Sequence, residues 1–276
     1  MIQPAMQYLT HVPRPPLSTF VEYLWSLQDA PAHALERIVP SGTLELVVNL
    51  HEDELRIYDA DGRACRRHAG ACVSGASQRF FVIDTREHAS IVGVHFWPGK
   101  ASALLGVPPG AIADQHVDLE ALWSRAALEL RERLCAAPTS AERFSVLEVF
   151  LLRRLAHRDR HPAIGFALDQ LALPGVSVGE VAARLELSRR RLIEIFTAEV
   201  GITPKRLSRV LRFQRACGVA RRRRELEWGR LAVACGYFDQ SHLIRDFREL
   251  TGTSPVEFVR ASAQAKDNHV AVRNGG

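Results

Sequence analysis

The pattern of apolar and polar positions divides the chain into a strand-rich first half and a helical second half. In the first half, short apolar runs rich in β-branched and aromatic residues are typical of strands. These runs predict strands over residues 44–50, 54–58, 79–84 and 90–97. Helical spacing then predicts helices over about 100–106, 118–136 and 140–157, with Asp118 as the N-cap of the second. The first half therefore fits a small β-barrel with a helical appendage.

The second half carries only helical spacing. Pro162 marks the start of one helix, and Ser177 caps the next. Seven helices are predicted in this half. Five cover residues 162–171, 178–185, 188–201, 204 to about 220, and 228–235, and the last two begin at Gln240 and at Pro255. The polar stretch 157–162 is the predicted linker, so we expect domains at 1–158 and 159–276 and an α+β fold class with an all-α second domain.

The helical half contains an internal repeat, in which residues 181–204 align with residues 231–255. The matched pairs are Ser188 with Asp239, Leu192 with Leu243, Phe196 with Phe247 and Gly201 with Gly252, each 51 residues apart, and Ala182 with Ala232, 50 residues apart. Each copy predicts a helix, a short turn and a capped helix that packs against the first. This is the helix-turn-helix pattern, in which the N-terminal turns of the second helix can enter a major groove of DNA.

The outward faces of the two capped helices carry side-chain types that suit DNA. In the second copy, Ser241, Arg245 and Arg248 lie opposite the apolar stripe that begins at Leu243, at 100° per residue. Arginine, glutamine, serine and histidine suit base edges or phosphates, and glutamate can accept a hydrogen bond from cytosine. The candidate DNA contacts are Arg190, Arg191, Ile193, Glu194, Gln240, Ser241, His242, Arg245 and Arg248.

The charge of the chain is uneven. Residues 1–158 carry 16 basic and 18 acidic side chains, whereas residues 159–276 carry 20 and 13, which suggests a polyanion as partner of the second half. Five cysteines without a CxxC pair favour a reducing cytoplasm over a disulfide framework or a zinc ribbon. No apolar run is long enough to span a membrane and the N-terminus lacks a signal-peptide pattern, so we expect a cytoplasmic protein without a membrane partner.

The most specific motif is GYFDQSHLIRDFRELTGTSP, over residues 236–255. With SVGEVAARLELSRRRLIEIFTAEVGITPKRL and RLSRVLRFQRACGVA, it makes residues 160–262 resemble the DNA-binding domain of the AraC/XylS family of bacterial transcription regulators. The resemblance implies two helix-turn-helix units, joined by a long helix, that read adjacent major grooves of double-stranded DNA. By position, the first unit would use Arg190, Ile193 and Glu194, and the second Gln240, Ser241, His242 and Arg245. Family members often have arginine where Glu194 stands.

For the first half, the resemblance implies a cupin-like domain that binds a small-molecule effector and forms a homodimer, with RNA polymerase as a further candidate partner. The amphipathic helices within 118–157 are the preferred dimer interface. PSGTLELVVNL and GVHFWPGKASALLGVP resemble segments of family members but imply no ligand. No histidine pair of the HxH type is present, so we expect no metal and no cofactor.

Three features of the chain have two interpretations each. His95 and Trp97 share one strand parity and either line an effector pocket or pack in the core. Cys65 and Cys72 are either a redox pair or isolated thiols. The arginine run 221–224 either contacts phosphates or is a solvated loop.

The leading hypothesis is a sequence-specific transcription regulator that is not an enzyme. One alternative is a DNA-repair alkyltransferase fused to the same DNA-binding module, although that chemistry needs a zinc-bound cysteine cluster or a proline-cysteine-histidine motif, which the sequence lacks. Another is an architectural DNA binder without an effector, which would show little preference among DNA sequences.

Overall fold

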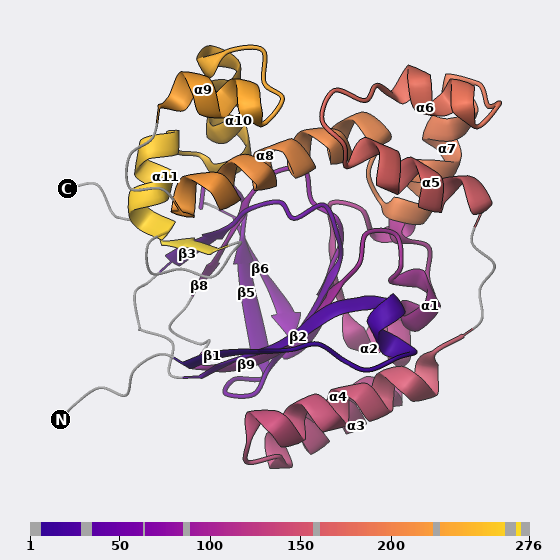
Figure 1. Cartoon of the computed structure of the whole chain (residues 1–276). Helices are drawn as coiled ribbons and strands as arrows, with labels where there is room; N and C mark the ends of the chain where they lie inside the picture. Colours follow the sequence, from indigo (N-terminus) through magenta and orange to yellow (C-terminus); the bar gives the residue numbers. More distant parts are fainter. Residues whose placement is uncertain are drawn as a thin grey trace.

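The computed structural model describes residues 7–28, 35–62, 64–84, 89–156, 161–222, 227–262 and 269–271. Figure 1 shows the strands below the long helix α8, with a helical group at each end of α8 and with α3 and α4 on the opposite side of the strands. The α+β class predicted from the sequence is confirmed, with a β-rich first part and a second part that is helical except for the short strand β11 (His269–Ala271), so the prediction of an all-α second domain is wrong at that strand.

The strands form two antiparallel sheets. The first sheet has the order β1 (Gln7–His11), β2 (Val21–Gln28), β9 (Ser90–Phe96), β4 (Glu45–Asn49), β7 (Ala71–Ser74) and β10 (His116–Asp118). The second has the order β11 (His269–Ala271), β3 (Leu35–Ile38), β8 (Phe81–Asp84), β5 (Glu54–Tyr58) and β6 (Cys65–Ala69). The four predicted strands are thus present as β4, β5, β8 and β9, and the other strands were not predicted.

The predicted barrel is not closed by strand pairing in the described residues. At one side, β6 and β10 meet through side chains instead of a backbone ladder. The Nδ1 atom of His68 lies 3.0 Å from the carboxylate of Asp118, and the rings of His68 and His116 lie 5.9 Å apart at their centroids. Side chains therefore fill the seam where a closed barrel would have backbone hydrogen bonds.

Short helices follow the strands. They are α1 (Ser102–Leu105), the 3-10 turn η2 (Pro109–Ile112), α2 (Leu119–Trp123), α3 (Arg125–Ala136) and α4 (Ser140–Arg154), and a first 3-10 turn, η1 (Leu17–Thr19), lies between β1 and β2. The single helix predicted over 118–136 is wrong, because Ser124 has a φ of +48° and breaks it. Asp118 holds the N-cap position, but its carboxylate accepts a hydrogen bond from the backbone N–H of Ala69 and does not cap α2.

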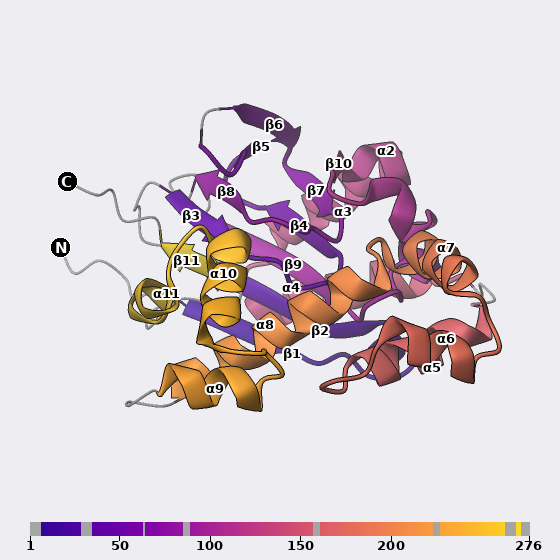
Figure 2. The same cartoon turned by 90° about the horizontal axis from the view of Figure 1, so that it is seen from above.

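The second part contains α5 (Pro162–Leu171), α6 (Val178–Arg184), α7 (Arg189–Val200), α8 (Pro204–Arg222), α9 (Trp228–Ala234), α10 (Gln240–Thr251) and α11 (Pro255–Ser262). In Figure 2, α8 runs between the group α5–α7 and the group α9–α11. All the helices predicted here are present. The predicted domain boundary at 158/159, and most of the predicted linker, fall on residues 157–160, outside the described residues.

One face of the first sheet is covered by helices. Leu46 and Val48 of β4 are fully buried in a hydrophobic cluster that also contains Leu147 and Leu151 of α4. The alternate residue Val47 packs on the other face, against the small cluster around Trp25. The alternation along β4 thus separates two apolar layers, as expected for a strand with both faces covered.

The first cluster continues into the helical part. It contains Ile112 of η2 and the buried residues Leu192 and Phe196 of α7. A second cluster contains Phe213 of α8 and the buried Leu243 and Phe247 of α10. None of the helices in the described residues is long and apolar enough to cross a membrane.

Candidate nucleic-acid interface

Two helix-turn-helix units lie at opposite ends of α8 (Figure 1). We call α6 and α7, with their turn, unit one, and α9 and α10, with their turn, unit two. Ala182 of α6 and Ala232 of α9 are 2% and 0% exposed, which lets the second helix of each unit approach closely. The predicted leucine and phenylalanine stripe of each second helix is fully buried. The repeat seen in the sequence is therefore a repeat of packing.

Polar side chains begin both second helices as predicted. The hydroxyl of Ser188 accepts a hydrogen bond from the backbone N–H of Arg191 (3.1 Å), and the carboxylate of Asp239 accepts one from the backbone N–H of His242 (2.7 Å). Both helices end at a glycine in the left-handed region, Gly201 with a φ of +95° and Gly252 with a φ of +72°. Ser177 and Glu180 form a complete capping box at the start of α6.

The exposed face of α7 carries an internal charge pair. The Nε atom of Arg190 lies 2.9 Å from one carboxylate oxygen of Glu194, and Arg191 lies 3.8 Å from the other. The hydrogen bond from Arg190 lowers the pKa of Glu194, so this carboxylate is ionised at neutral pH. Ile193 beside it is 39% exposed. All four predicted contacts of unit one are on the surface, and Glu194 offsets part of their positive charge.

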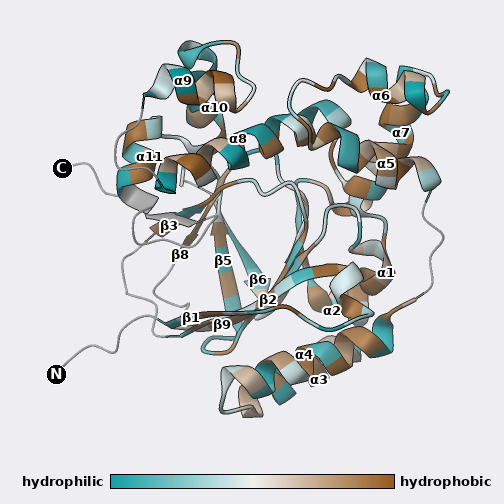
Figure 3. Cartoon of the chain, in the orientation of Figure 1, coloured by the Kyte–Doolittle hydropathy of each residue, from teal (hydrophilic) through white to brown (hydrophobic). Residues whose placement is uncertain are grey.

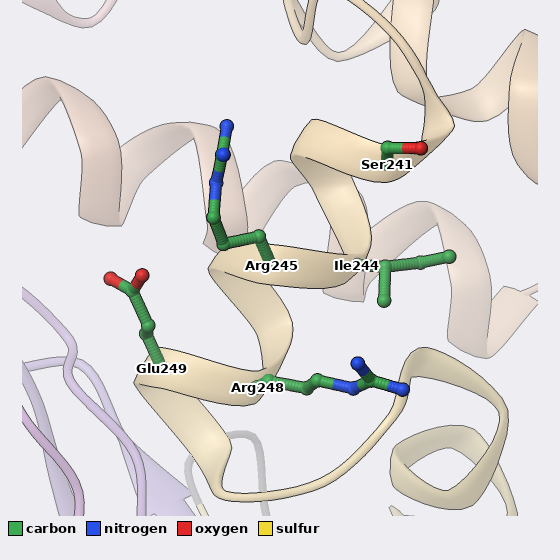
Figure 4. Close-up of a pocket in the computed structure, with 5 residues that line it drawn as sticks. All are labelled: Ser241, Ile244, Arg245, Arg248 and Glu249. Atoms are coloured by element: carbon green, nitrogen blue, oxygen red, sulfur yellow. The ribbon is translucent and has the colours of Figure 1, made fainter.

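The exposed face of α10 is more open. Gln240, Ser241, Arg245 and Arg248 are all exposed. An open hollow on this face is lined by Ser241, Ile244, Arg245, Arg248 and Glu249. Figure 4 shows that the two arginines extend away from the helix in different directions. Among the described residues, no carboxylate forms an ion pair with Arg245, so its guanidinium is available to a ligand.

His242 differs from the other predicted contacts because it packs within the protein. Its ring lies 5.2 Å from that of Tyr237 in an edge-to-face arrangement, and its Nε2 atom is 3.3 Å from the guanidinium of Arg212. Its Nδ1 atom accepts a hydrogen bond of 3.5 Å from the backbone N–H of Phe238. The histidine therefore supports the turn that precedes α10.

A buried ion network holds α10 on α8, and the sequence analysis missed it. Asp246 is 3% exposed, and its two carboxylate oxygens accept hydrogen bonds from Arg209 (2.8 Å) and Arg212 (2.9 Å) of α8. Arg209 also pairs with Glu249, and the guanidinium of Arg212 lies 4.5 Å from the centre of the Tyr237 ring. A buried carboxylate with two charged donors fixes the orientation of the helix. The signal in the sequence was an aspartate on the inner flank of an amphipathic helix.

The N-terminal part contacts the ends of α7 and α10 that lie farthest from their capped starts. A Cβ atom built on Gly201 would lie 3.3 Å from the side chain of Ala76, and one on Gly252 would lie 2.7 Å from the ring of Phe80. At η2, a Cβ atom on Gly110 would lie 2.7 Å from the carbonyl oxygen of Thr197. The segments around residues 75–80 and 109–112 therefore pack against the C-terminal ends of α7 and α10.

The long helix α8, which joins the two units, also lies on the N-terminal part. The side-chain amide of Gln214 donates a hydrogen bond of 2.5 Å to the carbonyl of Pro40. A Cβ atom on Gly42, which has a φ of +82°, would lie 2.8 Å from a methyl group of Leu207. These contacts leave the capped ends of α7 and α10 on the side away from the strands.

The structure places His95 and Trp97 in different surroundings. His95 is 6% exposed and stacks on the ring of Tyr23 at 4.7 Å, with the carboxylates of Glu22 and Glu45 within 4.0 Å. Trp97 lies beyond the end of β9, is 40% exposed, and donates its indole N–H to the carbonyl of Ser18. The pocket proposed for these two residues stays a prediction.

The cysteines and the arginine run complete the predicted features. All five thiols are free, with Cys65 exposed and Cys72 buried, and burial raises the pKa of Cys72 to about 12. Arg221 lies over the ring of Phe258, and exposed Arg222 lines an open hollow of α8 with Arg215 and Gly218. Residues 223–226 lie outside the described residues. The described residues contain no group of three or more histidine, cysteine or carboxylate side chains that could hold a metal ion.

Two known protein families match separate parts of the chain. A family described as "Domain of unknown function (DUF6597)" matches residues 9–118. A family described as "Helix-turn-helix domain" matches residues 181–261, which begin within α6 and contain the rest of unit one, α8 and all of unit two.

Similar proteins include the arabinose operon regulatory protein of Escherichia coli, 31% identical over 144 residues. The match covers 47% of each chain, so the chain spans about half the length of this curated relative. Among solved structures, ToxT from Vibrio cholerae covers 93% of this chain and 98% of its own, with 9% identity and a TM-score of 0.48. The C-terminal domain of AraT from Geobacillus stearothermophilus covers 37% of this chain and 88% of its own, with 22% identity and a TM-score of 0.35.

The range matched by the helix-turn-helix family contains the residues that build the repeat. These residues are the caps Ser188 and Asp239, the buried leucine and phenylalanine stripes, and the closing glycines Gly201 and Gly252. Residues 181–261 are therefore a helix-turn-helix domain, and the chain is similar over 144 residues to a transcription regulator of the AraC type, the arabinose operon regulatory protein.

Proposed function

We propose that the protein is a sequence-specific DNA-binding transcription regulator whose two recognition helices, α7 and α10, enter adjacent major grooves. The observation that carries the proposal is the exposed, capped start of each recognition helix, with the N-terminal part of the chain packed against the opposite ends. A helix that enters a major groove by its N-terminal turns needs this arrangement. The basic charge of residues 159–276 supports attraction to the phosphate backbone.

The side chains of the two units suit different tasks. Arg245 can form two hydrogen bonds to a guanine, and Gln240 can pair in the same way with adenine. Arg190 and Arg191 are held by Glu194, so we assign them to the phosphate backbone more than to bases. Arg222, exposed at the end of α8, suits a phosphate contact.

We further propose that residues 1–158 dimerise the chain, because one DNA-binding part covers one half-site. Leu128 of α3 and Val149 and Leu152 of α4 are 49%, 42% and 45% exposed, and these two helices lie on the outside of the molecule. Figure 3 shows hydrophobic residues along the visible surface of α4. A second copy that pairs α3 and α4 would remove these apolar side chains from water.

The resemblance of the chain to the AraC/XylS family supports two further partners. They are a small-molecule effector, bound by residues 1–158, and RNA polymerase. We place the protein in the cytoplasm, where its DNA is, and regard it as a regulator without enzymatic activity. Alkyl transfer to a cysteine requires a reactive thiolate. Burial raises the pKa of Cys72 to about 12 and also raises the pKa of Cys217. These two thiols therefore stay protonated at neutral pH and do not supply a reactive thiolate.

The test is DNA capture from the source genome by the full chain, followed by sequencing and competition against random duplex. A regulator yields a common site that random duplex competes for poorly. An architectural binder yields scattered fragments that random duplex displaces equally well, and this result would contradict the proposal. Mass spectrometry of the protein after incubation with alkylated DNA tests the enzyme alternative, because alkyl transfer would add mass to a cysteine.

A further inference from the structure

The turn of unit two exposes an aromatic side chain that the proposed function has not used. Phe238 is 88% exposed, and no other large apolar side chain in the described residues reaches that value. It directly precedes Asp239, which caps α10, and it is followed by the exposed residues Gln240 and Ser241. The ring therefore stands at the end of the recognition helix that is free of the N-terminal part.

The backbone on both sides of Phe238 is fixed. Tyr237 is 4% exposed, and its backbone N–H donates to the carbonyl of Ala232 (2.9 Å). The backbone N–H of Phe238 itself is held by His242, and the carboxylate of Asp239 is bound to the start of α10. With both neighbours anchored, the ring cannot turn inward without breaking the turn. Its exposure is a property of the fold of unit two.

The repeat gives an internal comparison for this position. Phe238 corresponds to Leu187 in unit one, 51 residues earlier. Leu187 is partly buried and packs against the hydrophobic cluster of that unit. The same position thus packs inward in unit one and projects outward in unit two, where it lies beside the residues that suit DNA.

The chemistry of a major groove limits what the ring can contact there. Base edges in the groove present hydrogen-bond donors and acceptors, and their one apolar group is the C5-methyl of thymine. A phenylalanine side chain can pack against that methyl group. Arg245 lies about two turns further along α10, or roughly 10 Å, which corresponds to about three base pairs.

We propose that Phe238 is a specificity-determining residue that reads a thymine through its C5-methyl group, within about four base pairs of the base that Arg245 contacts. This inference rests on the proposed function, because it requires α10 to enter a major groove. It assigns unit two a combined preference, for thymine through Phe238 and for guanine through Arg245, that unit one lacks.

The experiment uses duplexes selected from a random library by the full chain. Each thymine is replaced in turn by uracil, which removes only the methyl group, and the dissociation constant is measured by fluorescence anisotropy. For the wild-type protein we expect one position at which uracil weakens binding about four-fold, the effect of one apolar carbon group removed from a contact. Phe238→Ala should bind the parent duplex at least that much more weakly and should bind thymine and uracil equally at that position.

Val256→Ala is the matched control, because Val256 is 42% exposed on α11, outside the two units, and it should leave the thymine preference unchanged. Circular dichroism and thermal unfolding verify that Phe238→Ala folds. The inference is overturned if Phe238→Ala keeps the wild-type affinity, or keeps the full thymine preference at every position. If the wild-type protein binds selected and scrambled duplexes alike, the proposed function itself fails, and the two failures are thus distinguishable.

Discussion

Unit one and unit two share one architecture but use charge in opposite ways. The residue 51 positions after Glu194 is Arg245, so one outward position is acidic in unit one and basic in unit two. The residue 51 positions after buried Ile195 is Asp246, so one inward position is apolar in unit one and ionic in unit two. The carboxylate of unit one holds its own surface arginines, whereas that of unit two binds arginines of α8 and leaves Arg245 open.

The two units therefore share one packing motif but are held in place by different contacts. Unit one is supported by apolar contact with η2 of the N-terminal part. Unit two is supported by its ion network with α8 and by contact with Phe80. We therefore expect the two units to respond to different substitutions.

The largest effect is expected from Asp246→Ala. Removal of this buried carboxylate leaves Arg209 and Arg212 without their shared partner, which should lower the free energy of unfolding by about 3 kcal/mol. Urea denaturation measures the change. Glu249→Ala is the control, since Glu249 is an exposed partner of the same Arg209 and should cost less than about 1 kcal/mol. Equal losses in the two variants would show that the buried network does not anchor α10.

Gly110→Val tests the support of unit one. The new side chain would enter the space occupied by the backbone of α7 at Thr197, and we expect a loss of about 1–3 kcal/mol through forced separation of η2 and α7. Hydrogen exchange should accelerate at the amides of α7 and not at those of α10. Gly165→Ala in α5 meets open space and serves as the control that leaves both helices protected. Unchanged exchange in α7 would contradict the assigned support.

A smaller effect is expected from Glu194→Gln, which frees Arg190 and removes a negative charge from the proposed DNA face. The affinity for a selected duplex should rise about two- to five-fold, as for the loss of a weak exposed pair. Glu129→Gln is the matched control, because Glu129 pairs with Arg133 at the same i,i+4 spacing on α3, away from the two units. If both variants leave the affinity unchanged, unit one does not face DNA through this surface.

Much of the helical part could be predicted because its signals are local. Caps, closing glycines and the leucine and phenylalanine stripe all lie within a few residues of each other, and their repetition fixed the two units. The exposed positions of Arg245 and Arg248 followed from helical angles alone. The DNA contact of His242 stays a prediction, and a helical angle does not reveal that its ring packs against Tyr237 and lies near Arg212.

The β-rich part was predicted less completely. The strand β6 has the sequence CRRHA and is mostly exposed, so it lacks an apolar alternation, and β10 is three residues long. The break at Ser124 depends on a backbone angle that no residue type in the segment announces. The ion network around Asp246 joins residues 34 and 37 positions apart, and its pairing is set by the packing of α8 on α10.

The central claim is that unit two reads bases through Arg245, and one measurement tests it most directly. Affinities for a cognate and a random duplex are compared for wild type, Arg245→Ala and Arg222→Ala over a range of salt concentrations. We expect Arg245→Ala to lose about 1–3 kcal/mol of discrimination against the wrong base at one base pair. Arg222→Ala should weaken both duplexes alike and reduce the salt slope by about one unit. If Arg245→Ala weakens the cognate and the random duplex by the same factor, unit two does not read bases through this residue and the claim is contradicted.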